Sequence, residues 1–148
     1  MGDSEAEVYE SDSVERTEAI AADLAQTLAA GACVALHGDL GAGKTQFARG
    51  LVRGLGGDAR AVSSPTFVLL NVYETPRLTV YHLDAYRVHG AEDFESIGFT
   101  ELLDQPDGVV VVEWADRVRD LLPADRTVHV RITPLGEDRR SIEIGPIG

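Results

Sequence analysis

The sequence predicts an α/β domain of three layers, in which helices cover a small mixed sheet with a parallel core and antiparallel hairpin strands. Four consecutive valines, Val109–Val112, indicate a strand that is buried on both faces, and such strands are central and parallel. Short apolar segments flank a turn at residues 74–77 and another at residues 134–136, which predicts two hairpins. With 148 residues and a hydrophobic content of 44%, the chain is long enough for one domain spanning residues 1–148.

The N-terminal part of the chain predicts a short strand and then a helix. We expect residues 1–7 to be flexible and residues 8–10 to form an edge strand. Asp12 or Ser13 can cap a helix that runs to about Ala30, because a side-chain oxygen at that place accepts a free backbone N–H. The stripe of apolar residues along this segment has helical spacing.

The remaining elements follow from apolar periodicity and turn residues. Residues 33–37 are apolar enough for a buried strand, and Phe47, Leu51 and Leu55 recur every four residues, as on one face of a helix. The other expected elements are strands over 67–73 and 78–84, an acidic helix over 91–103, the valine strand at 109–112, helical or irregular chain over 114–122, and a final hairpin of 127–133 with 139–144.

The segment between the strand at 33–37 and the helix at 44–55 fits the phosphate-binding pattern G-x-x-x-x-G-K-[ST]. Glycines in such a loop allow backbone N–H groups to converge on an anion, and the helix that follows adds free donors and the positive end of its dipole. The fold class is therefore of the P-loop NTPase type. We expect the phosphates of a nucleotide to bind at Gly38, Asp39, Leu40, Gly41, Ala42, Gly43, Lys44 and Thr45.

Lys44 is the only lysine of the chain, although lysine and arginine together number 13. A compact ammonium can reach between the β- and γ-phosphates, where a planar guanidinium does not fit in the same way. The use of lysine at this one position supports the phosphate-binding interpretation, and it makes Lys44 a candidate catalytic residue.

A second loop, at Ser63–Thr66, follows the P-loop helix. Its hydroxyl groups are suited to order around a γ-phosphate and its metal, as switch loops of GTPases do, and Thr66 is the candidate contact. The alternative is an ordinary loop that leads into the next strand. The sequence leaves both interpretations open.

Two acidic residues at predicted strand ends are candidates for the metal site. A P-loop NTPase needs a carboxylate near Thr45, whose hydroxyl binds Mg²⁺. We assign Glu113 to the metal, directly or through water, and Asp84 to the metal shell or the attacking water, and the two roles are exchangeable. Both are candidate catalytic residues.

The neighbours of these acids allow more than one interpretation. His82 and Tyr86 are expected to pack, while Arg87 either stabilises transferred charge or pairs with a neighbouring acid. Trp114, the only tryptophan, is read as a core aromatic residue that caps the sheet edge, with a nucleotide contact as the alternative.

Four motifs in this order resemble the bacterial TsaE (YjeE) family. They are GDLGAGKT, then SPTF at Ser64–Phe67, YHLDAYR at Tyr81–Arg87 and VEW at Val112–Trp114, and the resemblance extends over roughly residues 13–145. Departures from the usual family pattern, at Gln46, Ala85 and Ala115, replace no group expected to touch phosphate or metal.

The resemblance implies a small P-loop α/β fold and an ATPase, with ATP and Mg²⁺ as cofactors, that supports N6-threonylcarbamoyladenosine (t6A) formation at position 37 of tRNAs reading ANN codons. The implied partners are the threonylcarbamoyl transferase subunit and its non-catalytic paralogue, proteins of the TsaD and TsaB type. In the family, the nucleotide and metal residues correspond to Lys44, Thr45, Asp84 and Glu113.

Composition and missing motifs restrict the alternatives. The net charge of −12 makes the chain a poor candidate for holding a nucleic-acid backbone alone, so tRNA is expected only through a partner. The only asparagine is Asn71, so the N-K-x-D motif of common GTPases is absent. A small-molecule P-loop kinase and a nucleotide-controlled binding module with incidental hydrolysis remain as rivals.

The sequence also predicts the compartment. No segment approaches the length of a membrane span, and the acidic N-terminus is unlike a signal peptide. The single cysteine, Cys33, excludes an internal disulfide and is expected to be a small buried strand residue. We therefore expect a cytoplasmic protein that does not associate with membranes.

Overall fold

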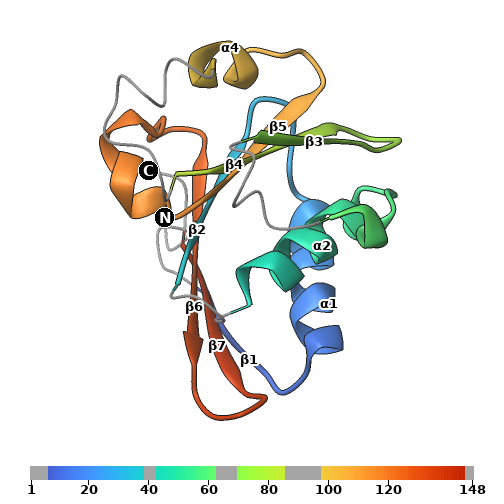
Figure 1. The fold of residues 1–148 in the computed structure, drawn as a ribbon, viewed down its shortest axis with the longest axis vertical. Coiled ribbons are helices and arrows are strands. Elements are labelled where there is room, and N and C mark those ends of the chain that lie inside the picture. Colours follow the sequence, from blue (N-terminus) through green and yellow to red (C-terminus); the bar gives the residue numbers. More distant parts are fainter. Residues whose placement is uncertain (1–6, 39–42, 63–69, 86–97, 146–148) are drawn as a thin grey trace.

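Figure 1 shows the computed structural model of the chain. The structure describes residues 7–38, 43–62, 70–85 and 98–145. All structural statements below concern these residues. The strands are β1 (Glu7–Ser11), β2 (Cys33–His37), β3 (Leu70–Glu74), β4 (Thr79–Asp84), β5 (Gly108–Glu113), β6 (Thr127–Pro134) and β7 (Arg140–Gly145). The α-helices are α1 (Val14–Ala25), α2 (Lys44–Gly54) and α4 (Phe99–Leu103), and the 3₁₀ segments are η2 (Ala59–Ala61) and η3 (Ala115–Leu121).

The seven strands form one mixed sheet in the order β1-β7-β6-β2-β5-β4-β3. The four central strands, β6, β2, β5 and β4, are mutually parallel. The edges are antiparallel, because β3 forms a hairpin with β4, β7 forms one with β6, and β1 pairs with β7. The predicted parallel core, both hairpins and the central position of the valine strand are confirmed.

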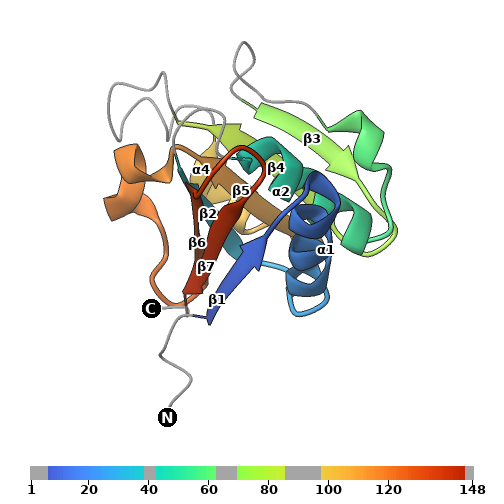
Figure 2. The ribbon, with the colours of Figure 1, turned by 90° about the horizontal axis from the view of Figure 1, so that it is seen from below.

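Helices cover both faces of this sheet, which confirms the three-layer architecture. On one face lie α1 and α2, side by side (Figures 1 and 2). Alternate residues of β2 and β5, such as Leu36 and Val111, join the hydrophobic core beneath these two helices. The other face carries α4 and η3, which pack Phe99 and Val118 against the intervening strand residues. Both faces of the valine strand are therefore buried, as the run of valines predicts.

The P-loop helix α2 packs closely against α1. A Cβ built on Gly50 would lie 2.7 Å from the Cβ of Ala21, and it would meet the carbonyl oxygen of Glu18 as well. Real Cβ atoms do not approach this closely, so the glycine permits the two helices to pack backbone against backbone.

Some predicted boundaries are wrong. The first helix has the predicted cap, because the Ser13 hydroxyl accepts the N–H of Arg16, but it ends at Ala25 rather than near Ala30. There the Thr27 hydroxyl donates to the carbonyl of Leu24, which competes with continuation of the helix. Glu7, expected to be flexible, belongs to the edge strand β1.

The predicted helix over 91–103 is described only from residue 98 onward. Gly98 has a φ of +87° and is the N-cap of α4, so the helix that the structure shows begins at Phe99. Residues 91–97 lie outside the described part of the chain, as do residues 67–69 of the predicted strand that ends at Tyr73.

Cys33 begins the central strand β2 and is buried, as expected. Burial raises the pKa of its thiol to about 12. Such a thiol stays protonated at neutral pH, which makes it a packing residue and not a nucleophile. None of the described helices has the length and the continuous apolar character that a membrane-spanning helix requires.

Candidate functional site

The candidate site lies at the edge of the sheet where the parallel strands end. Leu36 of β2 pairs with Glu113 of β5, and Asp84 of β4 pairs with Glu113 from the other side. Because the carboxyl ends of parallel strands meet at one edge, both candidate acids lie at the edge from which the P-loop departs, Glu113 on the strand next to β2 and Asp84 on the strand after that. The sequence predicted a central and parallel position for β5, and the register with β2 and β4 confirms it.

Only the two ends of the P-loop are described. Gly38 follows β2, and Gly43 is the N-cap of α2 with a φ of +113°, a value that favours glycine. A Cβ at Gly43 would lie 2.9 Å from Nε of Arg140, whose side chain comes from the start of β7. The predicted contacts Asp39, Leu40, Gly41 and Ala42 lie outside the described residues, as does Thr66.

Lys44 lies at the first position of α2 and is only 5% exposed. Its Nζ donates a hydrogen bond of 2.7 Å to the carbonyl oxygen of Gly38, which joins the two ends of the loop. The same ammonium lies 3.5 Å from the centroid of the Trp114 ring. A cation held over an aromatic face is stabilised by the ring quadrupole.

Trp114, which contacts Lys44, has an unusual left-handed backbone conformation. It is the one non-glycine residue of the described chain with a positive φ, at φ 58° and ψ 41°. For such a residue this conformation costs on the order of 1–3 kcal/mol and needs support from its surroundings. It turns the chain sharply between Glu113 and η3. The ring also packs at the side of the second hydrophobic core, so Trp114 both caps that core and contacts the P-loop lysine.

Glu113 forms a buried contact with His82. The Nε2 of His82 lies 2.6 Å from Oε2 of Glu113, and the two side chains are 1% and 4% exposed. Both residues face α2, since they continue the inward rows of β4 and β5 that begin with Val80 and Val109. The acid assigned to the metal is thus held by a neighbouring strand.

The candidate metal ligands are Thr45, Asp84 and Glu113. Asp84 is 2% exposed, and Thr45 lies half-buried in the first turn of α2. No group of three or more His, Cys, Asp or Glu side chains suited to a metal occurs in the described part of the chain. Two carboxylates and a hydroxyl still fit Mg²⁺, because this ion takes oxygen ligands, keeps several waters and uses one or two carboxylates together with phosphates.

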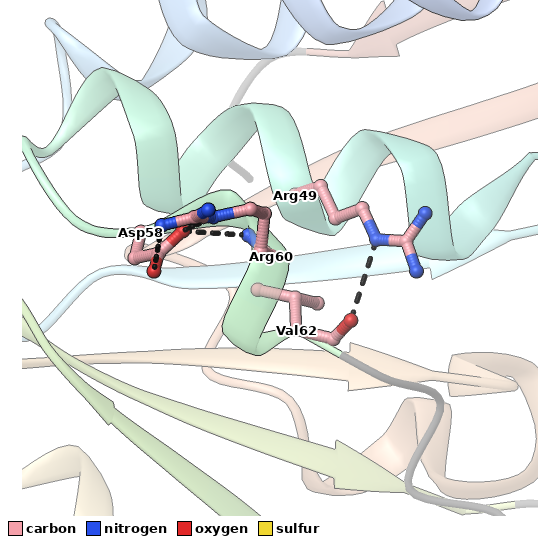
Figure 3. A network of polar contacts seen from close by, with 4 residues as sticks. All are labelled: Arg49, Asp58, Arg60 and Val62. Carbon is pink, nitrogen blue, oxygen red and sulfur yellow. Dashed lines mark hydrogen bonds and ion pairs between the residues drawn. The ribbon is translucent and has the colours of Figure 1, made fainter.

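The entry to the second predicted loop is anchored to the P-loop helix (Figure 3). Arg49 of α2 donates from Nε to the carbonyl oxygen of Val62 at 3.3 Å, and Val62 is buried. Asp58 caps η2 by accepting the N–H of Arg60 at 2.9 Å and also pairs with its guanidinium, which lowers the pKa of that carboxyl. Val62, the last described residue before that loop, is therefore held beside α2.

The structure adds two residues to the predicted set. His82 was expected only to pack, although the sequence placed it in a polar cluster at a strand end. Arg140 has no sequence signal, because its nearness to Gly43 depends on the pairing of β7 with β6.

The P-loop pattern connects a central strand to a helix that begins with a buried lysine, and two acids lie at the ends of adjacent strands of the same mixed sheet. These features define a P-loop α/β domain. Residues 11–142 match the family model of the threonylcarbamoyl adenosine biosynthesis protein TsaE. The chain belongs to the TsaE family.

Individual relatives agree with this assignment. The chain is 39% identical over 134 residues to the tRNA threonylcarbamoyladenosine biosynthesis protein TsaE of Bacillus subtilis, covering 90% of this chain and 82% of that protein. It is 45% identical over 114 residues to TsaE of Treponema pallidum, covering 77% and 82%. The crystal structure of Bacillus subtilis YdiB superposes with a TM-score of 0.77 and 31% identity, covering 97% of this chain and 86% of that one.

Proposed function

We propose that this protein is a P-loop ATPase that supports t6A formation at position 37 of ANN-decoding tRNAs. The observation that carries the proposal is the juxtaposition of a buried lysine with two buried acids on adjacent parallel strands. Lys44 begins α2, and Glu113 and Asp84 are register partners at the sheet edge from which the P-loop departs. Membership of the TsaE family supports the tRNA pathway.

Each residue has a distinct role in this proposal. The Lys44 ammonium and the N–H groups at the start of α2 hold the phosphates of ATP and offset their charge. Thr45 and one of the two acids, Glu113 or Asp84, would hold Mg²⁺, which supplies charge neutralisation at the transferred phosphoryl group. Of the two acids, the one not on the metal orients the attacking water. Arg140 lies beside Gly43 and adds a further positive charge at the helix start.

The proposal includes partners and a compartment. We infer that the protein acts with the threonylcarbamoyl transferase subunit and its paralogue, and that tRNA binds through them, because a net charge of −12 opposes direct binding to a polyanion. A tRNA-modifying assembly of this kind places the protein in the cytoplasm.

Calorimetric titration with MgATP, MgADP and MgGTP tests the nucleotide assignment. We expect the adenine nucleotides to bind in preference to GTP, and Lys44→Ala to lose most of the affinity, because the loop N–H groups alone then face the phosphate charge. Arg77→Ala, which alters a side chain bonded to the carbonyl of Ala25 away from the P-loop, is the matched control for loss of a basic residue. Equal or tighter binding of GTP, or unchanged binding of ATP by Lys44→Ala, contradicts the assignment.

A further inference from the structure

Packing alone does not explain why a histidine, rather than an apolar residue, lies at position 82 beside Glu113. His82 is fully buried in the middle of β4, between Val80 and Asp84 on the inward row of that strand. Its neighbours on the same face of β5, Val109 and Val111, are apolar. A valine would fill such a position without bringing polar nitrogens into the core, and burial of a polar group is unfavourable unless it gains a hydrogen bond.

The hydrogen bond fixes the state of the imidazole. We assign the proton to Nε2 of His82, which then donates to Oε2 of Glu113 at 2.6 Å, because an ionised carboxylate only accepts. Nδ1 is buried and has no hydrogen-bond partner in the described chain. The Tyr73 ring lies against the imidazole, with centroids 6.0 Å apart and a tilt of 49°. Among the described residues, the one polar contact of the His82 side chain is therefore that with Glu113.

The same contact restricts Glu113. With Oε2 occupied by His82, the carboxylate cannot rotate freely, and its other oxygen, Oε1, is not part of this contact. A metal-binding or water-binding carboxylate gains from such a support, because its free oxygen is held in one direction before the ligand arrives.

We propose that His82 is a positioning residue that holds Glu113 in the orientation required for ATP hydrolysis. The proposal rests on the proposed function, since the reaction is the one assigned above. His82 itself touches neither the nucleotide nor the metal. It acts through the carboxylate, as the partners of metal ligands do in other enzymes.

Two substitutions separate a positioning role from a packing role. His82→Gln places an amide N–H at the same number of bonds from Cβ as Nε2, so it can still donate to Glu113. His82→Asn places its amide nearer the Nδ1 position and cannot reach. Both variants bury an amide of similar polarity, so each is the control for the other, and their thermal midpoints verify that they are folded.

We expect His82→Asn to lower kcat for ATP hydrolysis in the presence of the partner proteins by ~10–100-fold, the usual effect of losing such a support, while the KM for ATP changes little. His82→Gln should recover most of the lost kcat. In a Glu113→Ala background, His82→Asn should add almost nothing, because residues that act as a unit are not additive. Equal kcat values for the Gln and Asn variants, or losses that add in the double variant, would overturn the proposal.

A second readout needs no turnover. Proton–nitrogen spectra of the imidazoles should show a slowly exchanging Nε2–H for His82, assigned by its loss in His82→Gln. The signal should persist in Asp84→Asn and disappear or shift strongly in Glu113→Ala. An Nδ1–H tautomer, or a signal indifferent to Glu113→Ala, overturns the proposal. If the parent protein hydrolyses no ATP even with its partners, the ATPase assignment fails, and the spectra alone decide whether His82 is bonded to Glu113.

Discussion

The ammonium of Lys44 lies 3.5 Å from the centroid of the Trp114 ring while it donates to the carbonyl oxygen of Gly38. The P-loop lysine is thus held between the start of its own loop and the residue that follows Glu113. Contacts of this kind between a cation and an aromatic face are worth on the order of 0.5–2 kcal/mol. The ring that caps the second core is thereby linked to the residue expected to bind phosphate.

Trp114 should therefore report nucleotide binding. When Lys44 turns toward phosphate, its positive charge leaves or shifts over the indole, and the emission of the ring responds. Since no other tryptophan occurs in the chain, the signal has a single origin. We expect a saturable change in fluorescence on titration with MgATP, and a much smaller one in Lys44→Ala. A flat titration of the parent protein at saturating nucleotide would reduce Trp114 to a packing residue.

The acids at the strand ends should matter for turnover more than for folding. We expect Glu113→Ala and Asp84→Ala each to lower ATP hydrolysis by ~10²-fold or more, because each removes a preorganised group that acts on developing charge or on the attacking water. Glu143→Ala, at an exposed site on β7, is the control. The measurement is ATP turnover with the partner proteins present, together with circular dichroism to verify folding. Parental turnover in either variant would remove that acid from the site.

The close packing of α1 against α2 makes a prediction about stability. Gly50→Ala introduces a methyl group at a place where Ala21 would be 2.7 Å away, and overpacking of this kind costs about 1–3 kcal/mol of the free energy of unfolding. Gly136→Ala is the matched control, because a Cβ there has nothing within 4 Å, and its effect should stay below about 1 kcal/mol. Urea denaturation of both variants measures the difference. Equal stabilities would mean that the two helices can separate without cost.

The sequence predicted the sheet well because its signals are local and strong. The valine run, the two turns and the P-loop pattern each determine an element without help from distant residues. The predicted end of α1 was wrong because the apolar spacing of the sequence continues beyond Ala25. In the structure, the Thr27 hydroxyl donates a hydrogen bond to a backbone carbonyl instead, and the chain turns.

Residues of the site could be predicted from the sequence where a motif or the end of a clearly marked strand fixes their position. Lys44 belongs to a motif, and Glu113 ends a strand that the sequence marks as central. The contacts of His82 and Arg140 depend on how strands are paired, so no local pattern reveals them. The contact of Trp114 with Lys44 also depends on the left-handed backbone conformation of Trp114, and a tryptophan in the sequence does not predict such a conformation.

We propose that this protein hydrolyses ATP as a component of a tRNA-modifying assembly. The small domain shows no lid over the P-loop in its described part, and exclusion of water from the phosphates is what usually makes hydrolysis fast. Docking against a partner would supply both that cover and the surface that holds tRNA. Nucleotide should in turn alter docking, because coupling between two ligands is reciprocal.

The most direct test is ATP turnover by the protein alone, with the transferase subunit and its paralogue, and with tRNA added separately, alongside a pull-down in each nucleotide state. We expect slow turnover in isolation, acceleration of ~10-fold or more by the partner pair, which corresponds to ~1.4 kcal/mol of barrier, and little tRNA bound without the pair. Full-speed turnover by the isolated protein, with no partner retained in any nucleotide state, would contradict it and favour a self-sufficient kinase.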